Sequence, residues 1–165
     1  MKIYISKGSA EGPTEIAAFD NALDVAGISN LNLIYLSSVI PPNSRIILGK
    51  PKLRNCFGEK AFVVMSKIIA TKINQTVCAG IGWVRYERDK RGLFVEITGN
   101  SKEEVEEKIN ETLEHMRKYR KYRFGKINMV LNEITCEKYP VCALVSAFYD
   151  IEKWDNKECN DTKMV

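Results

Sequence analysis

The sequence predicts one α+β domain in which layers of strands pack with two helices. A chain of 165 residues suits a single domain, and 45% hydrophobic with 28% charged residues is typical of a folded globular protein. Two segments carry apolar residues at helical spacing, whereas the other apolar runs are short and end at turn residues. Many strands with two helices favour a layered α+β arrangement.

The N-terminal part of the chain predicts a strand, a helix and a second strand. Residues 2–6 alternate as in a short strand, and a helix follows between Pro13 and Gly27, which suits a left-handed C-terminal cap. The helical residues expected to face inward recur at spacings of three and four: Ile16, Phe19, Leu23 and Ala26. Residues 31–40 are apolar at both odd and even positions, which predicts a strand covered on both faces.

The remainder of the chain predicts further strands and a second helix. The strands are expected at 45–48, 60–68, 76–86, 93–98, 127–135 and 141–150. Ser101 and Glu104 form a capping box that begins a helix, whose apolar stripe is Val105, Ile109, Leu113 and Met116. The polar residues 151–165 predict a mobile tail.

Composition argues against several functional classes. No apolar run approaches the roughly 18 residues of a membrane-spanning helix, so we expect a cytoplasmic protein with no membrane partner. Five cysteines without a C-x-x-C pair, together with the single histidine His115, indicate neither a metal site nor a disulfide framework. Residues 117–126 mix basic and aromatic side chains, but a helix that ends in Lys and Arg complements its own dipole, so no nucleic-acid partner is expected.

Three features are candidates for a site. Asp20 lies about 40° from Ile16 on the helical wheel and borders the predicted inward face, where an acid needs a cationic partner; a solvated rim residue is the alternative. Glu96 lies in the strand 93–98, and alternation alone directs it to water. Ser37-Ser38 is a common dipeptide, but its place at the end of an apolar strand before two prolines is unusual.

A set of short motifs spans most of the chain. Residues 8–42 contain Gly-Ser-x-Glu-Gly, Phe-Asp-x-Ala-Leu, Ala-Gly-Ile-x-Asn-x-Asn-Leu-Ile and Ser-Ser-x-x-Pro-Pro. Residues 89–99 add a Gly-hydrophobic-Glu strand, and residues 136–149 a final strand. In these motifs the chain resembles the pyruvoyl-dependent arginine decarboxylases, particularly the archaeal enzymes. The likeness is weakest at 50–75 and after residue 150.

The resemblance implies a four-layer αββα sandwich that cuts itself into a β chain, 1–37, and an α chain, 38–165. The Ser38 hydroxyl attacks the Ser37 carbonyl, and the resulting ester is eliminated and hydrolysed to leave a covalent pyruvoyl group derived from Ser38. Asn32 matches the residue that holds the Ser37 carbonyl during this step. Neither a metal nor pyridoxal phosphate is implied.

The resemblance further implies decarboxylation of L-arginine to agmatine and CO2 in polyamine biosynthesis. Glu96 matches the proton donor, which requires a partly buried setting and reverses the orientation that alternation predicts. Asp20 matches the residue that binds the guanidinium, and Ser29 and Leu31 match positions lining that slot. Family members form homotrimers with sites between subunits. Two alternatives stay open: a pyruvoyl decarboxylase for another basic amino acid, and a processed but non-catalytic regulatory paralogue.

Overall fold

The computed structural model describes residues 1–154, which contain two helices and nine strands. The helices are α1 (Glu15–Ala26) and α2 (Lys102–Lys118). The strands are β1 (Lys2–Glu11), β2 (Asn32–Tyr35), β3 (Val39–Ile40), β4 (Arg45–Leu48), β5 (Lys60–Ala70), β6 (Thr76–Arg85), β7 (Gly92–Gly99), β8 (Asn128–Thr135) and β9 (Val141–Glu152).

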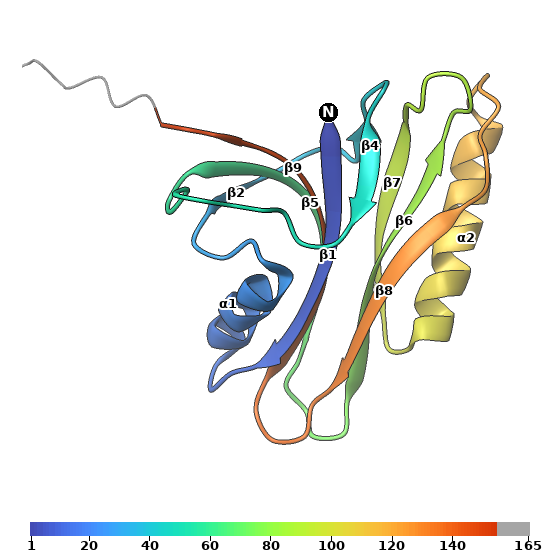
Figure 1. Ribbon diagram of the computed structural model, residues 1–165. Helices are drawn as coiled ribbons and strands as arrows, with labels where there is room; N and C mark the ends of the chain where they lie inside the picture. The colour runs from blue at the N-terminus through green and yellow to red at the C-terminus, as the bar shows by residue number, and fades with distance from the viewer. Residues whose placement is uncertain (155–165) are drawn as a thin grey trace, which may run out of the picture.

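The strands form two sheets that stack face to face (Figure 1). The five-stranded sheet has the order β2-β5-β9-β1-β4, and the four-stranded sheet the order β3-β7-β6-β8. Helix α1 covers the outer face of the first sheet, and α2 covers the outer face of the second (Figure 1). The predicted αββα sandwich is therefore confirmed.

Each pair of neighbouring layers encloses its own apolar cluster. Val64, Ile81 and Phe94 belong to the cluster between the two sheets, whereas Ile109 of α2 packs with residues of the four-stranded sheet. A Cβ atom added to Gly82 would lie 2.1 Å from Cγ2 of Ile109, so this glycine allows α2 to approach the sheet closely. Both faces of the four-stranded sheet are consequently covered.

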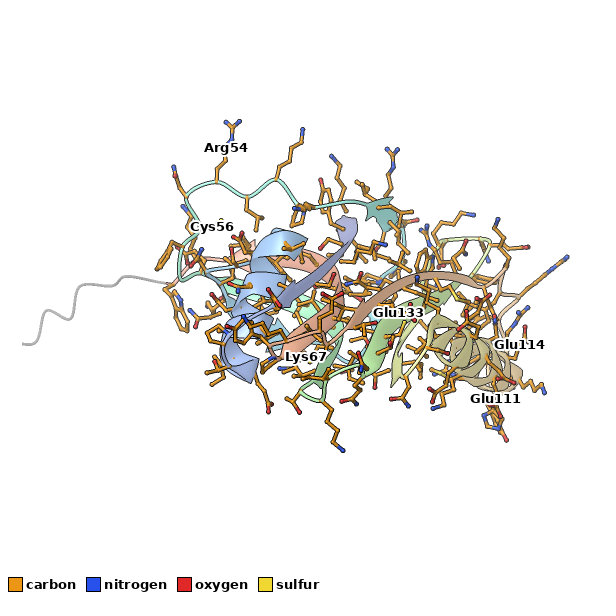
Figure 2. The ribbon with its side chains drawn as sticks, turned by 90° about the horizontal axis from the view of Figure 1, so that it is seen from below. Arg54, Cys56, Lys67, Glu111, Glu114 and Glu133 are labelled. Atoms are coloured by element: carbon orange, nitrogen blue, oxygen red, sulfur yellow. The ribbon has the colours of Figure 1, made fainter. Side chains whose placement is uncertain are left out.

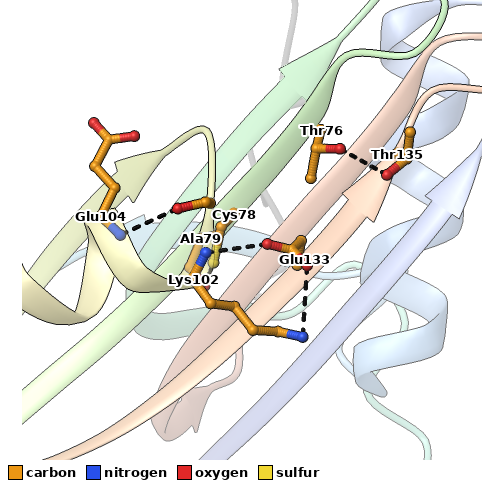
Figure 3. A network of polar contacts seen from close by, with 8 residues as sticks. Thr76, Cys78, Ala79, Lys102, Glu104, Glu133 and Thr135 are labelled. Carbon is orange, nitrogen blue, oxygen red and sulfur yellow. Dashed lines mark hydrogen bonds and ion pairs between the residues drawn. The ribbon is translucent and has the colours of Figure 1, made fainter.

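The predicted caps Gly27 and Ser101 are confirmed, whereas α1 begins after an N-cap at Thr14 that the sequence analysis did not predict, so Pro13 precedes the helix. The Thr14 hydroxyl accepts from the Ala17 N–H at 3.2 Å, and Gly27 ends α1 in the left-handed conformation. The Ser101 hydroxyl caps α2 by accepting from the Glu104 N–H. Helix α2 is also tied to β8, because the Lys102 N–H donates to the Glu133 carboxylate at 3.0 Å and the two side chains form an ion pair (Figure 3).

The predicted inward face of α1 is wrong in one respect. Ile16 is 80% exposed, and the buried positions are Ala18, Ala22, Leu23 and Ala26. The reason is the close approach of α1 to β1: a Cβ atom at Gly8 would lie 2.0 Å from the carbonyl oxygen of Ala22. Only small side chains fit such a contact, so the helix turns its alanines inward and leaves Ile16 and Asp20 exposed.

The predicted continuous strand at 31–40 is also wrong, because the segment divides between the two sheets. Strand β2 pairs in parallel with β5 at the edge of the five-stranded sheet, and β3 pairs antiparallel with β7 at the edge of the other. Residues 36–38 cross from one sheet to the other. Apolar side chains along this edge remain exposed, among them Tyr35 at 54% and Val39 at 58%.

The start of the predicted tail belongs to the folded domain. Ile151 and Glu152 complete β9, and Trp154 bonds to the loop before β5. The rest of the predicted tail, residues 155–165, lies outside the described residues. No helix within residues 1–154 is long and apolar enough to cross a membrane.

Candidate active site

The crossover between the sheets holds Ser38 by its backbone. The Ser38 carbonyl accepts from the Phe94 N–H of β7 at 2.8 Å, and the next residue, Val39, pairs with Leu93. From the five-stranded sheet, the Tyr149 hydroxyl donates to the Val39 carbonyl at 3.0 Å. Ser38 and the adjacent Val39 are therefore held together by contacts from both sheets.

Ser38 adopts an unusual backbone conformation. Its φ angle is +61°, in the left-handed region. Among the described residues, the other non-glycine positions with positive φ are four asparagines and Lys90. Asparagine tolerates this region, whereas for most residues it costs about 1–2 kcal/mol. The contacts to β7 and β9 maintain a strained serine at the predicted cleavage position.

Ser38 and Glu96 are in direct contact. The Ser38 hydroxyl donates to Oε1 of Glu96 across 2.5 Å, and both residues are half-buried. Glu96 lies opposite Ile81 in β6 and shares the parity of Phe94, which faces the space between the sheets. A carboxylate in hydrogen-bond contact with a serine hydroxyl can accept its proton and so activate it as a nucleophile.

The orientation toward water that alternation predicts for Glu96 is corrected by this arrangement. Alternation assumes that one sheet face is solvated, but α2 covers the outer face of β7 and the five-stranded sheet covers the inner face. Val95 packs under α2, so Glu96 turns to the space between the sheets.

Tyr149 is a site residue that the sequence reasoning missed. Burial, together with the nearby charge of Glu96, raises the pKa of Tyr149 far above its usual value, so its hydroxyl stays a neutral donor at physiological pH. Its ring packs edge-on against Phe94, with centroids 6.3 Å apart. Alternation along β9 could have indicated its inward orientation, because Tyr149 lies on the same strand face as Val145 and Ala147.

Asn32 lies on β2, away from the Ser38 contacts. Its side-chain N–H donates to the Gly58 carbonyl at 2.5 Å, and its backbone N–H donates to the Glu59 carbonyl at 2.8 Å. Within residues 1–154 of one chain, no hydrogen bond joins Asn32 to Ser37, although the resemblance implies that contact.

The predicted substrate-binding residues lie on the other side of the five-stranded sheet. Asp20 is exposed on α1, Leu31 packs against the α1 cluster, and the Ser29 hydroxyl donates to Asp24 at 2.8 Å. Because α1 covers the outer face of this sheet, the sheet separates Asp20 from Glu96 within one chain. No hydrogen bond or ion pair in the described part of the chain connects these residues with Ser38.

In the described part of the chain, titratable side chains do not gather into a metal site. Within residues 1–154, no group of three or more His, Cys, Asp or Glu side chains is placed to hold a metal ion. Ser38, by contrast, has what the precursor of a covalent pyruvoyl group needs: a hydroxyl next to a carboxylate, on a strained and firmly held backbone.

The fold is an αββα sandwich, with a serine pair at the crossover between its sheets and a carboxylate beside the second serine hydroxyl. These features are those of a self-processing pyruvoyl enzyme. The family model for "Pyruvoyl-dependent arginine decarboxylase (PvlArgDC)" matches residues 2–153. The chain therefore belongs to this family, and the predicted enzyme class, a lyase with a covalent pyruvoyl group, is confirmed.

Curated relatives agree with the family match. The chain is 34% identical to the pyruvoyl-dependent arginine decarboxylase of Pyrococcus abyssi over 146 residues, which cover 88% of this chain and 92% of the relative. It is 36% identical to the one of Methanocaldococcus jannaschii over 148 residues, or 88% and 87% of the two chains. It is 57% identical to the one of Methanothermobacter thermautotrophicus over 85 residues, or 49% and 52%.

Proposed function

We propose that the chain cleaves itself between Ser37 and Ser38, forms a pyruvoyl group from Ser38, and decarboxylates L-arginine to agmatine and CO2 for polyamine biosynthesis. The single domain is divided by this cut into chains 1–37 and 38–165. The observation that carries the proposal is the contact of the strained Ser38 with Glu96 at 2.5 Å, in a chain of this family. Its four described cysteines are free thiols, which suits the cytoplasm.

Self-cleavage begins when Ser38 Oγ attacks the Ser37 carbonyl carbon and passes its proton to Glu96. The C–N bond breaks as the acyl group moves to oxygen, which gives an ester and a free Ser38 amine. Loss of the Ser38 α-proton then expels the Ser37 carboxylate and leaves a dehydroalanine. Water hydrolyses its imine form, releases ammonia and leaves the keto group.

Positions 38 and 96 then serve decarboxylation. The pyruvoyl group would supply a keto carbon that bonds to the substrate amine. The resulting conjugated system would accept the electron pair that remains on the substrate when CO2 leaves. Glu96, held half-buried between the sheets, delivers a proton to the substrate carbon that lost CO2. The Asp20 carboxylate pairs with the guanidinium, and Ser29 and Leu31 line the slot around it.

A homotrimer brings these two groups of residues together. Within one chain the five-stranded sheet separates Asp20 from Glu96, so a complete site needs α1 of a second copy. The edge that carries Ser38 exposes Tyr35 and Val39, and exposed apolar side chains of this size favour a protein interface. Sedimentation should therefore give the mass of three processed units, and a monomer with full activity would contradict this arrangement.

Self-cleavage is tested by mass spectrometry of purified protein after incubation. We expect fragments of 37 and 128 residues, the larger blocked to Edman sequencing because its first residue lacks an amine. Ser38→Ala should remain one chain. An uncut wild-type chain of 165 residues after prolonged incubation would refute the pyruvoyl proposal.

Substrate choice is tested by CO2 release from labelled arginine, ornithine, lysine and histidine. We expect arginine alone to be turned over efficiently, because a planar guanidinium matches the Asp20 carboxylate. Preference for another basic amino acid would favour the first alternative. A cleaved protein inactive on all four would favour a regulatory paralogue.

A further inference from the structure

Trp154 lies just beyond the part of the chain that the family model covers, which ends at residue 153. Its indole N–H donates to the Gly58 carbonyl at 2.9 Å, and its backbone N–H donates to the Glu59 carboxylate at 3.0 Å. The Lys60 ammonium lies over the indole ring, 4.8 Å from its centroid, and also pairs with Glu152. The end of β9 is thus fastened to residues 58–60.

The same short loop surrounds Asn32. The Gly58 N–H donates to the Asn30 carbonyl at 2.7 Å, and the Glu59 carbonyl accepts from the Asn32 N–H at 2.8 Å. The Gly58 carbonyl accepts the Asn32 side-chain N–H at 2.5 Å, so this one oxygen binds both Asn32 and Trp154. Figure 2 labels Arg54 and Cys56, which lie on the preceding part of this loop.

A carbonyl oxygen has two lone pairs, and at Gly58 both have a partner. The Trp154 bond therefore fixes the direction of the carbonyl, and the carbonyl fixes the plane of the Asn32 carboxamide. Asn32 is itself exposed in one chain, so a second copy can bring a reacting group to its other side-chain N–H, whose direction the bond to Gly58 sets. Gly58 has a φ of +78°, which a non-glycine residue would reach only with strain.

We infer that Trp154 is a positioning residue for self-cleavage, acting on Asn32 through the carbonyl oxygen of Gly58. This inference rests on the proposed function and on the role that the resemblance implies for Asn32, which is to hold the Ser37 carbonyl, here one supplied by a second copy, as the ester forms. Trp154 touches no reacting atom. Its effect falls on the acyl shift and not on later turnover, because among residues 1–154 its hydrogen bonds go to Gly58 and Glu59 and not to the decarboxylation residues Glu96 and Asp20.

The test compares Trp154→Phe with wild type at a temperature where both are fully folded by circular dichroism. Phenylalanine keeps a ring under Lys60 and the backbone N–H but removes the indole donor. Self-cleavage should slow about 3- to 10-fold, the loss expected for one hydrogen bond. Trp154 is 55% exposed, so the variant is expected to fold. Tyr139→Phe, at another partly exposed aromatic residue, is the matched control and should cleave at the wild-type rate.

A second measurement identifies the step that Trp154 affects. Hydroxylamine cleaves the ester and leaves serine, not pyruvoyl, at the start of the 38–165 fragment, so the rate of that product reports ester formation. This rate should fall by the same factor in Trp154→Phe. A wild-type rate of ester formation in the variant would overturn the inference alone, whereas failure of wild type to cleave would overturn the proposed function.

Discussion

The left-handed conformation of Ser38 predicts that glycine is more stable than alanine at this position. Neither Ser38→Gly nor Ser38→Ala can cleave, and both lose the hydroxyl contact to Glu96, so the pair differs mainly in backbone preference. At a φ of +61°, alanine bears a cost of about 1–2 kcal/mol that glycine avoids. Glycine in turn loses about 0.4–1 kcal/mol because its unfolded chain is more flexible. From the middle of each range, the free energy of unfolding should therefore be about 0.8 kcal/mol larger for Ser38→Gly.

The assay is chemical denaturation of both variants at one protein concentration, because assembly would make apparent stability depend on concentration. Ser9 is the control, since it lies within β1 opposite Ala143 and does not have a positive φ. There the order should reverse, with Ser9→Gly less stable than Ser9→Ala by about 0.5–1 kcal/mol. Equal or greater stability of Ser38→Ala would show that the crossover is not strained.

Three further predictions concern chemistry and pH. Glu96→Gln, normalised to pyruvoyl content, should lower turnover by about 10² to 10⁴; normal turnover would mean that another acid delivers the proton. Asp20→Asn should weaken arginine use by about 2–5 kcal/mol without slowing self-cleavage, and unchanged kinetics would remove it from the site. Burial raises the pKa of Cys142 to about 11 from 9.0, so the folded thiol keeps its proton after the unfolded one has lost it, and stability should fall as pH rises through this window. Denaturation at pH 8 and pH 10 should show a smaller fall in Cys142→Ala, and equal falls would contradict this assignment.

Local signals predicted most of the secondary structure. The caps at Gly27 and Ser101 are properties of a few neighbouring residues, and the apolar stripe of α2 repeats without interruption. Such patterns depend on the chain's own geometry, so the sequence alone was sufficient to place both helices. The layer order came from the family resemblance and not from these patterns.

Tertiary contacts decided the features that the pattern missed. Residues 31–40 are apolar at both odd and even positions. However, an apolar residue that is exposed on one chain cannot be distinguished by sequence from one that is buried within its own sheet. The exposure of Ile16 depends on the close approach of Gly8 to α1, which no helical wheel contains. Glu96 faces inward because β7 is covered on both sides, a fact of layering and not of alternation.

The crossover at residues 36–38 is also a covalent link between the two sheets. Its loss would change the number of molecules into which one subunit unfolds. After a cut at Ser37, the five-stranded sheet would be assembled from two polypeptides, with β1 of the small chain lying between β9 and β4 of the large one. Unfolding of the uncut chain is unimolecular at the level of one subunit, whereas the cut subunit separates into two molecules.

Refolding of the processed protein would then require two different chains to meet. Strand β1 pairs over eight positions with β9, so a small chain alone would leave this long edge without its partner. The uncut chain avoids this problem, because both halves are present at high effective concentration. A processed subunit that is once unfolded should therefore recover poorly on dilution, and its recovery should rise with protein concentration. We therefore expect folding to precede the proposed self-cleavage.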